Sequence, residues 1–259
     1  MDLTDKIALV TGAGSGLGAA AALALADEGA DLVLVSRTRD ELDAVARRVE
    51  AKGRQALVAV ADTADEGMMA DAFAAVKARF GRLDFVFANA GVNGTWAPIA
   101  ELTPDEWDET IRINLRGTYL TLHFAVPLMT ARGGSIAITS SINGTRTFTS
   151  AGASAYATSK AGQLALGQML ALELAQHGIR VNVICPGAIE SEIADNTEKR
   201  ETDAAEVPAH YPEGKVPLTG GRPGKAADVA KLCVFLASAR SRHISGTPIW
   251  IDGAQSLLV

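Results

Sequence analysis

Short apolar runs and longer helix-like segments alternate along the chain. Runs of four to six mostly apolar residues are typical of strands that are covered on both faces. We predict strands at residues 7–10, 31–35, 56–60, 83–88, 135–139, 180–184 and 248–251. The segments between them predict helices at residues 18–28, 40–51, 65–80, 104–129, 155–176 and 225–236. This alternation indicates an α/β fold with a parallel sheet between two layers of helices.

Two of the predicted helices, 104–129 and 155–176, carry apolar residues around most of their circumference. A helix that is apolar on nearly all sides must be buried on nearly all sides. One side can cover the sheet, and the other side needs a partner. We therefore expect a homo-oligomer.

The segment 190–224 interrupts the pattern, because it carries four prolines, many charges and little periodicity. Loops of this length in a compact domain are usually functional or disordered. It follows a predicted strand, so it emerges at the carboxyl edge of the sheet, where ligands bind. We interpret it as a substrate lid, the alternative being a decorative insertion. No linker divides the chain, which predicts one domain spanning residues 1–259.

Composition narrows the classes of function. The net charge of −6 argues against a nucleic-acid surface, and no apolar run approaches the length of a membrane span. The acidic N-terminus leads directly into a strand pattern, so no signal peptide is visible. The two cysteines, Cys185 and Cys233, have no local partner and suggest a reducing compartment. These features predict a cytoplasmic protein that binds a small molecule; no metal site is predicted.

The segment Thr11–Gly18, TGAGSGLG, follows the first predicted strand and opens a helix. Glycines let the backbone approach a pyrophosphate, and a helix N-terminus offers free N–H groups to the anion. The spacing is Thr-Gly-x-x-x-Gly-x-Gly, with Gly12, Gly16 and Gly18. A turn with no ligand is the alternative, but its place between strand and helix favours nucleotide binding.

Tyr156 and Lys160 are four residues apart, so on a helix they share one face. A free phenol has a pKa of about 10, and moving it near 7 takes about 4 kcal/mol. An ammonium at ~4 Å supplies about that much at an effective dielectric of ~20. The pair therefore predicts a tyrosine that exchanges protons near neutral pH.

In its order of motifs the chain resembles the short-chain dehydrogenase/reductase family, of the compact single-domain type, nearly from end to end. The motifs are TGAGSGLG, Asp62, ANAG at 88–91, Asn114, Ser141, the Tyr156/Lys160 pair and CPGAIES at 185–191. The resemblance implies a doubly wound, Rossmann-type sheet of seven parallel strands. It also implies a nicotinamide dinucleotide as cofactor and a homotetramer.

The resemblance gives four residues a catalytic role. Tyr156 would donate a proton to a carbonyl oxygen or accept one from an alcohol, and Lys160 would hold the nicotinamide ribose and lower the pKa of the phenol. Ser141 would hydrogen-bond the reacting oxygen, and Asn114 would hold a water that links Lys160 to solvent. Ser141 and Tyr156 are two residues further apart than is common in the family, which leaves Ser140 as the alternative serine.

The same resemblance predicts the cofactor contacts. Asp62 would contact the adenine, and Asn89 would brace the strand beneath the cofactor. Ser36 stands where an acid would select NAD, and Arg37 follows it and could grip a 2′-phosphate. We therefore expect NADP, with NAD as the alternative. The remaining cofactor candidates are Gly12, Ser15, Gly16, Leu17, Gly18, Ala90, Gly91, Pro186, Gly187, Ile189 and Ser191.

Substrate recognition is expected on loops around this site. The candidates are Asn93, Trp96, Asn143, Phe148, Ile189 and Tyr211. They combine apolar surface with few charges, which suits a neutral or amphiphilic carbonyl compound. The predicted function is hydride transfer between a nicotinamide and a carbonyl or secondary alcohol. The alternatives are a catalytically silent NAD(P)-sensing protein of the same fold and, less favoured because Ser36 replaces an acid, a methyltransferase.

Overall fold

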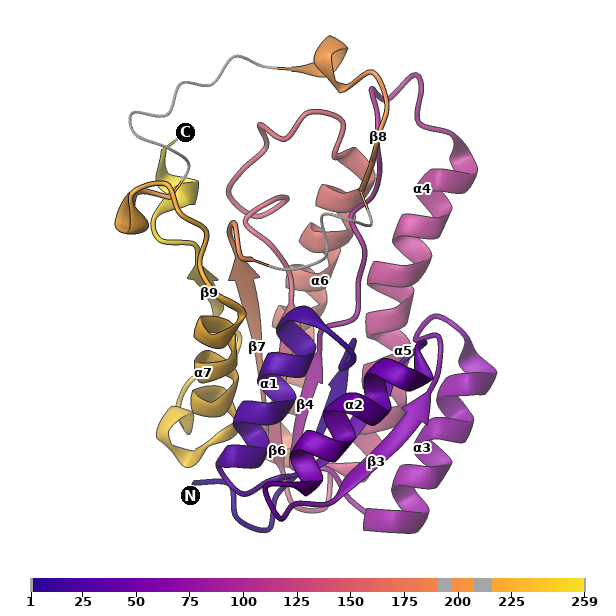
Figure 1. Ribbon diagram of the computed structural model, residues 1–259, viewed down its shortest axis with the longest axis vertical. Coiled ribbons are helices and arrows are strands. Elements are labelled where there is room, and N and C mark those ends of the chain that lie inside the picture. Colours follow the sequence, from indigo (N-terminus) through magenta and orange to yellow (C-terminus); the bar gives the residue numbers. More distant parts are fainter. Residues whose placement is uncertain (1, 191–196, 207–215, 259) are drawn as a thin grey trace.

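The computed structural model describes residues 2–190, 197–206 and 216–258. Its main element is a seven-stranded parallel sheet in the order β3-β2-β1-β4-β6-β7-β9 (Figure 1). The strands of this sheet are β1 (Ile7–Thr11), β2 (Asp31–Ser36), β3 (Ala56–Val60), β4 (Phe85–Ala88), β6 (Gly134–Thr139), β7 (Ile179–Pro186) and β9 (Pro248–Ile251). Two further strands, β5 (Gly94–Trp96) and β8 (Thr197–Lys199), form a separate parallel pair.

The α-helices are α1 (Gly16–Asp27), α2 (Arg39–Glu50), α3 (Glu66–Phe80), α4 (Pro104–Ile111), α5 (Gly117–Ala125), α6 (Ser154–Glu173) and α7 (Ala226–Ala237). A π-helical turn, η1 (Arg112–Arg116), joins α4 to α5. Short 3₁₀ turns follow as η2 (Val126–Leu128), η3 (Leu174–His177), η5 (Thr202–Ala205), η6 (Pro217–Thr219), η7 (Ala239–Ser241) and η8 (Gln255–Leu257). Among the described residues, no helix has the length and apolar character that crossing a membrane requires.

The predicted doubly wound sheet of seven parallel strands is confirmed, and each predicted strand overlaps one of its strands. The predicted continuous helix 104–129 is wrong in one respect. It is divided by the π-helical turn, and its last residues form the 3₁₀ turn η2. Side-chain bonds of Asn114, in the middle of the π-turn, tie this segment to the chain that follows β4. The small β5–β8 pair was not predicted.

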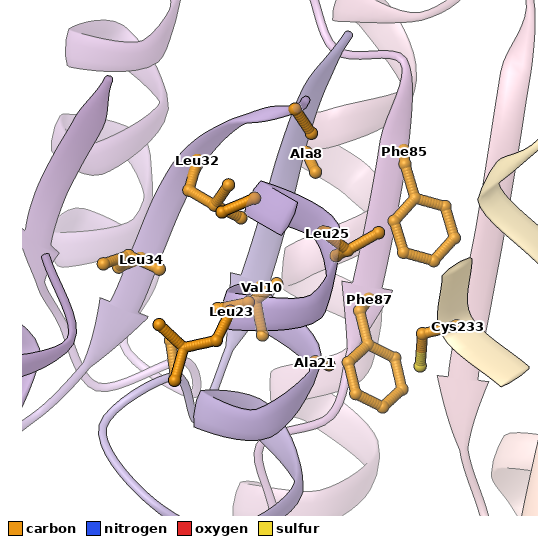
Figure 2. Packing of buried hydrophobic residues seen from close by; sticks show 14 of the residues in the cluster. Ala8, Val10, Ala21, Leu23, Leu25, Leu32, Leu34, Phe85, Phe87 and Cys233 are labelled. Atoms are coloured by element: carbon orange, nitrogen blue, oxygen red, sulfur yellow. The ribbon is translucent and has the colours of Figure 1, made fainter. Parts of the chain in front are cut away.

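Two layers of helices bury the two faces of the sheet. One core cluster joins α1, α2 and α7 to the face that carries Ala8, Val10 and Phe87. A second cluster joins α3, α5 and α6 to the face that carries Ile7 and Leu9. Figure 1 shows α1, α2 and α7 on the near side of the sheet. Figure 2 shows Phe85 and Phe87 of β4 extending to the same side, with Cys233 of α7 beside them. Successive residues of a strand point to opposite faces, so continuous apolar runs fill both cores.

The strand order reverses between β1 and β4, because the chain runs from β1 outward to β3 and then returns to β4. In open parallel sheets, ligands bind beside the carboxyl ends of the strands at such a switch point. In Figure 1 the strands β7 and β9 point toward the upper half of the molecule, where the loops and β8 lie. This edge is therefore the first place to look for a functional site.

Candidate active site

One long cleft follows the carboxyl edge of the sheet. Its lining comes from the segments that directly follow six strands, β1, β2, β3, β4, β6 and β7. It contains Gly12, Ser15, Gly16, Leu17, Ser36, Arg37, Asp62, Asn89, Ala90, Gly91, Ser141, Tyr156, Lys160, Pro186, Gly187 and Ile189, all of them predicted site residues. The structure thus brings most of the predicted nucleotide residues and three of the four predicted catalytic residues, all but Asn114, into one cavity.

The loop between β1 and α1 has the geometry of a phosphate cradle. Gly12 has a φ of +66°, which a residue with a side chain rarely adopts. A Cβ on Gly18 would collide with the Gly12 carbonyl oxygen, so only glycine lets the first turn of α1 approach the loop. The Ser15 side chain makes no capping hydrogen bond, which leaves first-turn N–H groups available to an anion. Gly18 is buried behind the cleft and shapes the loop without lining it.

Asn89 and Thr11 join the ends of three strands. The backbone N–H of Asn89 donates to the Thr11 hydroxyl at 2.9 Å, and its side-chain amide donates to the Thr11 carbonyl at 3.2 Å. The Thr139 hydroxyl at the end of β6 donates to Asn89 Oδ1 at 3.1 Å. These bonds fix the floor of the cleft at the switch point, which is the bracing position predicted for Asn89.

Asp62 lies in the cleft after β3, and Arg112 of the π-turn holds its carboxylate. Arg112 donates to Asp62 Oδ2 at 3.1 Å, and the backbone N–H of Ala64 donates to Oδ1 at 2.9 Å. Burial acts to raise the pKa of Asp62, but the bonds from Ala64 and Arg112 outweigh it and the pKa lies below its ordinary value. Asp62 is therefore an ionised, oriented carboxylate. Arg112 was not among the predicted site residues.

The far end of the cleft carries charges of both signs. Ser36 and the exposed Arg37, two of the predicted cofactor residues, line it, and so does Glu41 of α2. The Glu41 carboxylate lies against Gly14 of the phosphate loop, where a Cβ on that glycine would approach it to 2.5 Å. Sequence reasoning searched for an acid at the end of β2 and missed this one, which comes from the first turn of the next helix.

Ser141 and Ser140 have different environments. Both serines line the cleft, but it is the Ser141 hydroxyl that interacts with the phenol of Tyr156, where it acts to lower the pKa of that phenol. Ser141 Oγ also accepts the backbone N–H of Asn143 at 3.1 Å. The Ser140 hydroxyl instead donates to the Lys160 carbonyl at 2.7 Å, and this bond ties the end of β6 to α6. The geometry favours Ser141 over Ser140 as the serine that faces a reacting oxygen.

Tyr156 and Lys160 lie side by side on the first turns of α6, with the Lys160 Nζ 5.5 Å from the centre of the Tyr156 ring. Both are buried, and Lys160 Nζ donates to the Thr139 carbonyl at 3.1 Å. Burial raises the pKa of Tyr156 against the hydrogen bond with Ser141, and burial lowers the pKa of Lys160 to about 8. The expected lowering of the phenol pKa by Lys160 is therefore not what this structure shows, because desolvation is the larger effect.

Asn114 is completely buried at the centre of the π-turn. Its Oδ1 accepts the backbone N–H of Val92 at 2.8 Å, and its Nδ2 donates to the Val92 carbonyl at 2.9 Å and to Ser159 Oγ at 3.0 Å. A Cβ on Gly91 would lie 3.0 Å from Asn114 Oδ1 and 3.5 Å from Lys160 Nζ. Asn114 therefore lies close to Lys160 and locks the segment after β4 to α6. Its predicted role in holding a water stays a prediction.

The predicted substrate residues fall into two groups. The Trp96 ring lies 6.2 Å from the Tyr156 ring, and its indole N–H donates to the Asn93 carbonyl at 3.2 Å. Asn143 and Phe148 line a separate hollow beside the first turn of α6, together with Ala97 and Ile99. Trp96 thus lies next to the candidate catalytic tyrosine and is tied to Asn93, whereas Asn143 joins this hollow to Ser141 through its backbone N–H.

A family model described as enoyl-(acyl carrier protein) reductase matches residues 12–254. The chain belongs to the short-chain dehydrogenase/reductase family. The family is one of NAD(P)-dependent oxidoreductases.

Three members of the family show how far the similarity extends. The crystal structure of a 3-ketoacyl-ACP reductase from Sinorhizobium meliloti 1021 shares 54% identity at a TM-score of 0.94, covering 98% of this chain and 100% of that one. Levodione reductase of Leifsonia aquatica is 37% identical over 98% of this chain and 95% of its own length. A carveol dehydrogenase from Mycobacterium avium, solved in complex with NAD, shares 28% identity at a TM-score of 0.88, covering 99% of each chain.

Two predicted site residues of this short-chain dehydrogenase/reductase are not described by the structure, and several residues that line the cleft were not predicted. Ser191 and Tyr211 fall outside the described residues. The cleft is also lined by residues that no motif singled out, namely Thr38, Glu41, Ala61, Thr63, Val92, Ile113 and Thr139. Only Ala61 and Thr139 lie directly at the end of a predicted strand, so strand ends alone could have located these two.

Proposed function

We propose that the chain is an NADP-dependent reductase of ketones, running in reverse as a dehydrogenase of secondary alcohols, with Tyr156 as general acid and base. The arrangement of Ser141, Tyr156 and Lys160 in the same cleft as the phosphate loop carries this proposal. Each of the three is held by its surroundings, and the phenol lies at the surface of the cavity that accommodates the cofactor. A nucleotide sensor without turnover would need only the phosphate loop and Asp62.

The residues of the cleft have different roles in the proposed reaction. The nicotinamide, when bound, supplies or takes up the hydride. Tyr156 remains protonated at neutral pH, because burial raises its pKa, and so it can donate a proton to the carbonyl oxygen in reduction. Ser141 donates a hydrogen bond toward the same oxygen, and Lys160, charged below about pH 8, holds the ribose and favours a developing phenolate.

A panel of ketones and alcohols, followed by the absorbance of reduced cofactor, tests this function. We expect ketone-dependent oxidation of the reduced cofactor and alcohol-dependent reduction of the oxidised one. Cofactor binding without turnover across the panel would support the silent, NAD(P)-sensing alternative.

The choice of NADP rests on Arg37 at the adenosine end of the cleft. A guanidinium grips a phosphate with charge-assisted hydrogen bonds, worth ~1.5–3 kcal/mol. Arg37→Ala is therefore expected to raise the KM for NADPH about 10- to 150-fold and to leave that for NADH nearly unchanged. Glu41→Gln is the matched variant, because it removes a carboxylate that faces the same adenosine end of the cleft and that would repel a phosphate. Preference of the wild type for NADH, or equal weakening of both cofactors by Arg37→Ala, would overturn the assignment.

We further propose that the substrate is a small carbonyl compound or alcohol and that the single domain has a substrate lid at residues 190–224, of which 191–196 and 207–215 lie outside the described residues. The names of the relatives point to 3-ketoacyl thioesters, levodione and carveol for those proteins. A homotetramer is supported by two large apolar side chains on the outer face of α6, Met169 and Leu172, which are 72% and 83% exposed in the single chain. Light scattering at micromolar concentration tests it, and the mass of one chain would refute it.

A further inference from the structure

The two-stranded sheet of β5 and β8 presents one face to the candidate catalytic tyrosine. Trp96 pairs with Lys199, Thr95 with Glu198, and Gly94 with Thr197. Directly paired residues of two strands lie on the same face, and successive residues alternate between faces. Trp96 and Lys199 therefore share a face, and Glu198 lies on the opposite one. In Figure 1, β8 lies beside the upper end of α4 and the start of α6.

Trp96 contacts both the ring of Tyr156 and the ammonium of Lys199. Its ring is 6.2 Å from the Tyr156 ring, and Lys199 Nζ lies 5.5 Å from the centre of the indole. The indole N–H is bonded to the Asn93 carbonyl, which fixes the ring in this position. A small molecule whose carbonyl meets Tyr156 and whose body crosses the indole would bring its far end to Lys199.

The positive charge of Lys199 is not paired with an acidic side chain of the described residues. In residues 2–190, 197–206 and 216–258, Lys199 takes part in no ion pair. The adjacent Arg200, by contrast, holds the Glu106 carboxylate with two hydrogen bonds of 2.8 and 2.9 Å and also donates to the Glu101 carbonyl. Bonding by Arg200 and by the N-terminus of α4 lowers the pKa of Glu106 to about 2. Arg200 thus compensates the charge of Glu106, whereas Lys199, which shares a face of the strand pair with Trp96, has no ion pair with any described residue.

We propose that Lys199 binds an anionic group of the substrate, and that the substrate class is therefore a keto acid, or the corresponding hydroxy acid, with its carboxylate separated from the carbonyl by a short apolar body. This inference rests on the proposed reductase function and narrows its substrate. It revises the expectation of a neutral compound, which considered only the few charges among the predicted loop residues. Lys199 was not among them.

Matched probes test the inference. 4-Oxocyclohexanecarboxylate carries the anion, and 4-oxocyclohexanecarboxamide has nearly the same shape without the charge. Wild-type enzyme is expected to have a kcat/KM about 10-fold or more higher for the acid than for the amide. Lys199→Met keeps the apolar stem and removes the charge. It is expected to raise the KM for the acid about 10-fold, with kcat and the KM for the amide nearly unchanged.

Lys77→Met is the control, because Lys77 is an exposed lysine of α3 with no ion pair among the described residues. It removes the same net charge far from β8, so it is expected to leave the ratio of acid to amide at the wild-type value. Equal kcat/KM for the two probes in the wild type, or equal losses with both probes in Lys199→Met, would overturn the inference while turnover of either probe preserves the proposed function.

Equilibrium binding separates the remaining cases. Calorimetry with 4-hydroxycyclohexanecarboxylate and its amide, at saturating cofactor, measures recognition without turnover. Tighter binding of the acid that Lys199→Met abolishes supports the anion site even if the reaction assigned to Tyr156 is wrong. Binding of neither probe, or equal binding of both, contradicts it.

Discussion

The two halves of the cleft are built in different ways. The cofactor half is lined by residues that directly follow strands of the main sheet, so the register of those strands fixes their positions. The other half, where we propose that the substrate binds and which we call the substrate half, is formed by the three-residue strands β5 and β8 and by the segment between β6 and α6. These segments are joined by few hydrogen bonds. One of them is the hydrogen bond from Ala97 N–H to the Gly152 carbonyl at 3.1 Å.

This difference separates what the fold determines from what varies between relatives. A nucleotide site at strand ends persists as long as the sheet persists, whereas a wall made of short strands can change its chemistry by a single substitution. Relatives of this chain carry names as different as 3-ketoacyl-ACP reductase, levodione reductase and carveol dehydrogenase, in agreement with that view. The boundary between the two halves is formed by Ser141, Tyr156 and Lys160, because elements of the cofactor half position these residues and the substrate half faces them.

The sharpest test of that boundary compares the two neighbouring serines. Ser141→Ala removes the hydroxyl that interacts with the Tyr156 phenol, and it is expected to lower kcat about 10²- to 10³-fold with little change in cofactor affinity. Ser140→Ala removes a buried bond to the Lys160 carbonyl, and it is expected to cost about 1 kcal/mol of folding free energy with turnover largely kept. Steady-state kinetics and thermal unfolding of both variants provide the measurements. A larger loss of kcat in Ser140→Ala would exchange the two roles.

Much of the cofactor half could be predicted from the sequence. The apolar runs located all seven strands, and the glycines of Thr11–Gly18 located the phosphate loop at the end of the first. Glu41 was missed because its reach back to Gly14 depends on how α2 packs, which a motif does not contain.

The substrate half could not be predicted to the same extent. Residues 94–96 and 197–199 are too short and too polar to form a strand pattern, and they pair only because the folded chain brings them together. The π-turn around Asn114 was also invisible, because its composition does not differ from that of an α-helix. Sequence reasoning therefore named Trp96 but not its neighbour Lys199.

The charge of Lys160 gives the cofactor half a characteristic pH dependence. Burial lowers the pKa of its ammonium to about 8, so the charge that we propose holds the ribose is present below that pH and lost above it. The kcat/KM for NADPH, which reports ionisations of the free enzyme, is expected to fall about 10-fold per pH unit above about pH 8. Tyr156, with a raised pKa, stays protonated in this range.

A matched variant tests whether the ionisation of Lys160 causes this fall in kcat/KM. Lys160→Arg keeps a positive charge at all accessible pH values, so its profile is expected to lack the fall above about pH 8. A fall at the same pH in Lys160→Arg would assign the ionisation to another group.

The smallest expected effect concerns the support of Asp62. Arg112→Met removes the guanidinium that orients the Asp62 carboxylate, a partly exposed pair, and is expected to weaken NADPH binding about 2- to 5-fold. Glu109→Gln alters the other partner of Arg112 outside the cleft and serves as the control, with a smaller change. Titration of NADPH fluorescence measures both. Unchanged affinity in Arg112→Met would show that the strand end alone positions Asp62.

Turnover by Tyr156→Phe tests the central claim most directly, because the ring and its packing remain while the hydroxyl is removed. The variant is expected to bind NADPH and to unfold at nearly the wild-type temperature, and its kcat for ketone reduction is expected to fall about 10²- to 10⁴-fold. That result would establish the Tyr156 phenol as the proton donor of the cleft. A kcat within about three-fold of wild type, with cofactor binding intact, would contradict it.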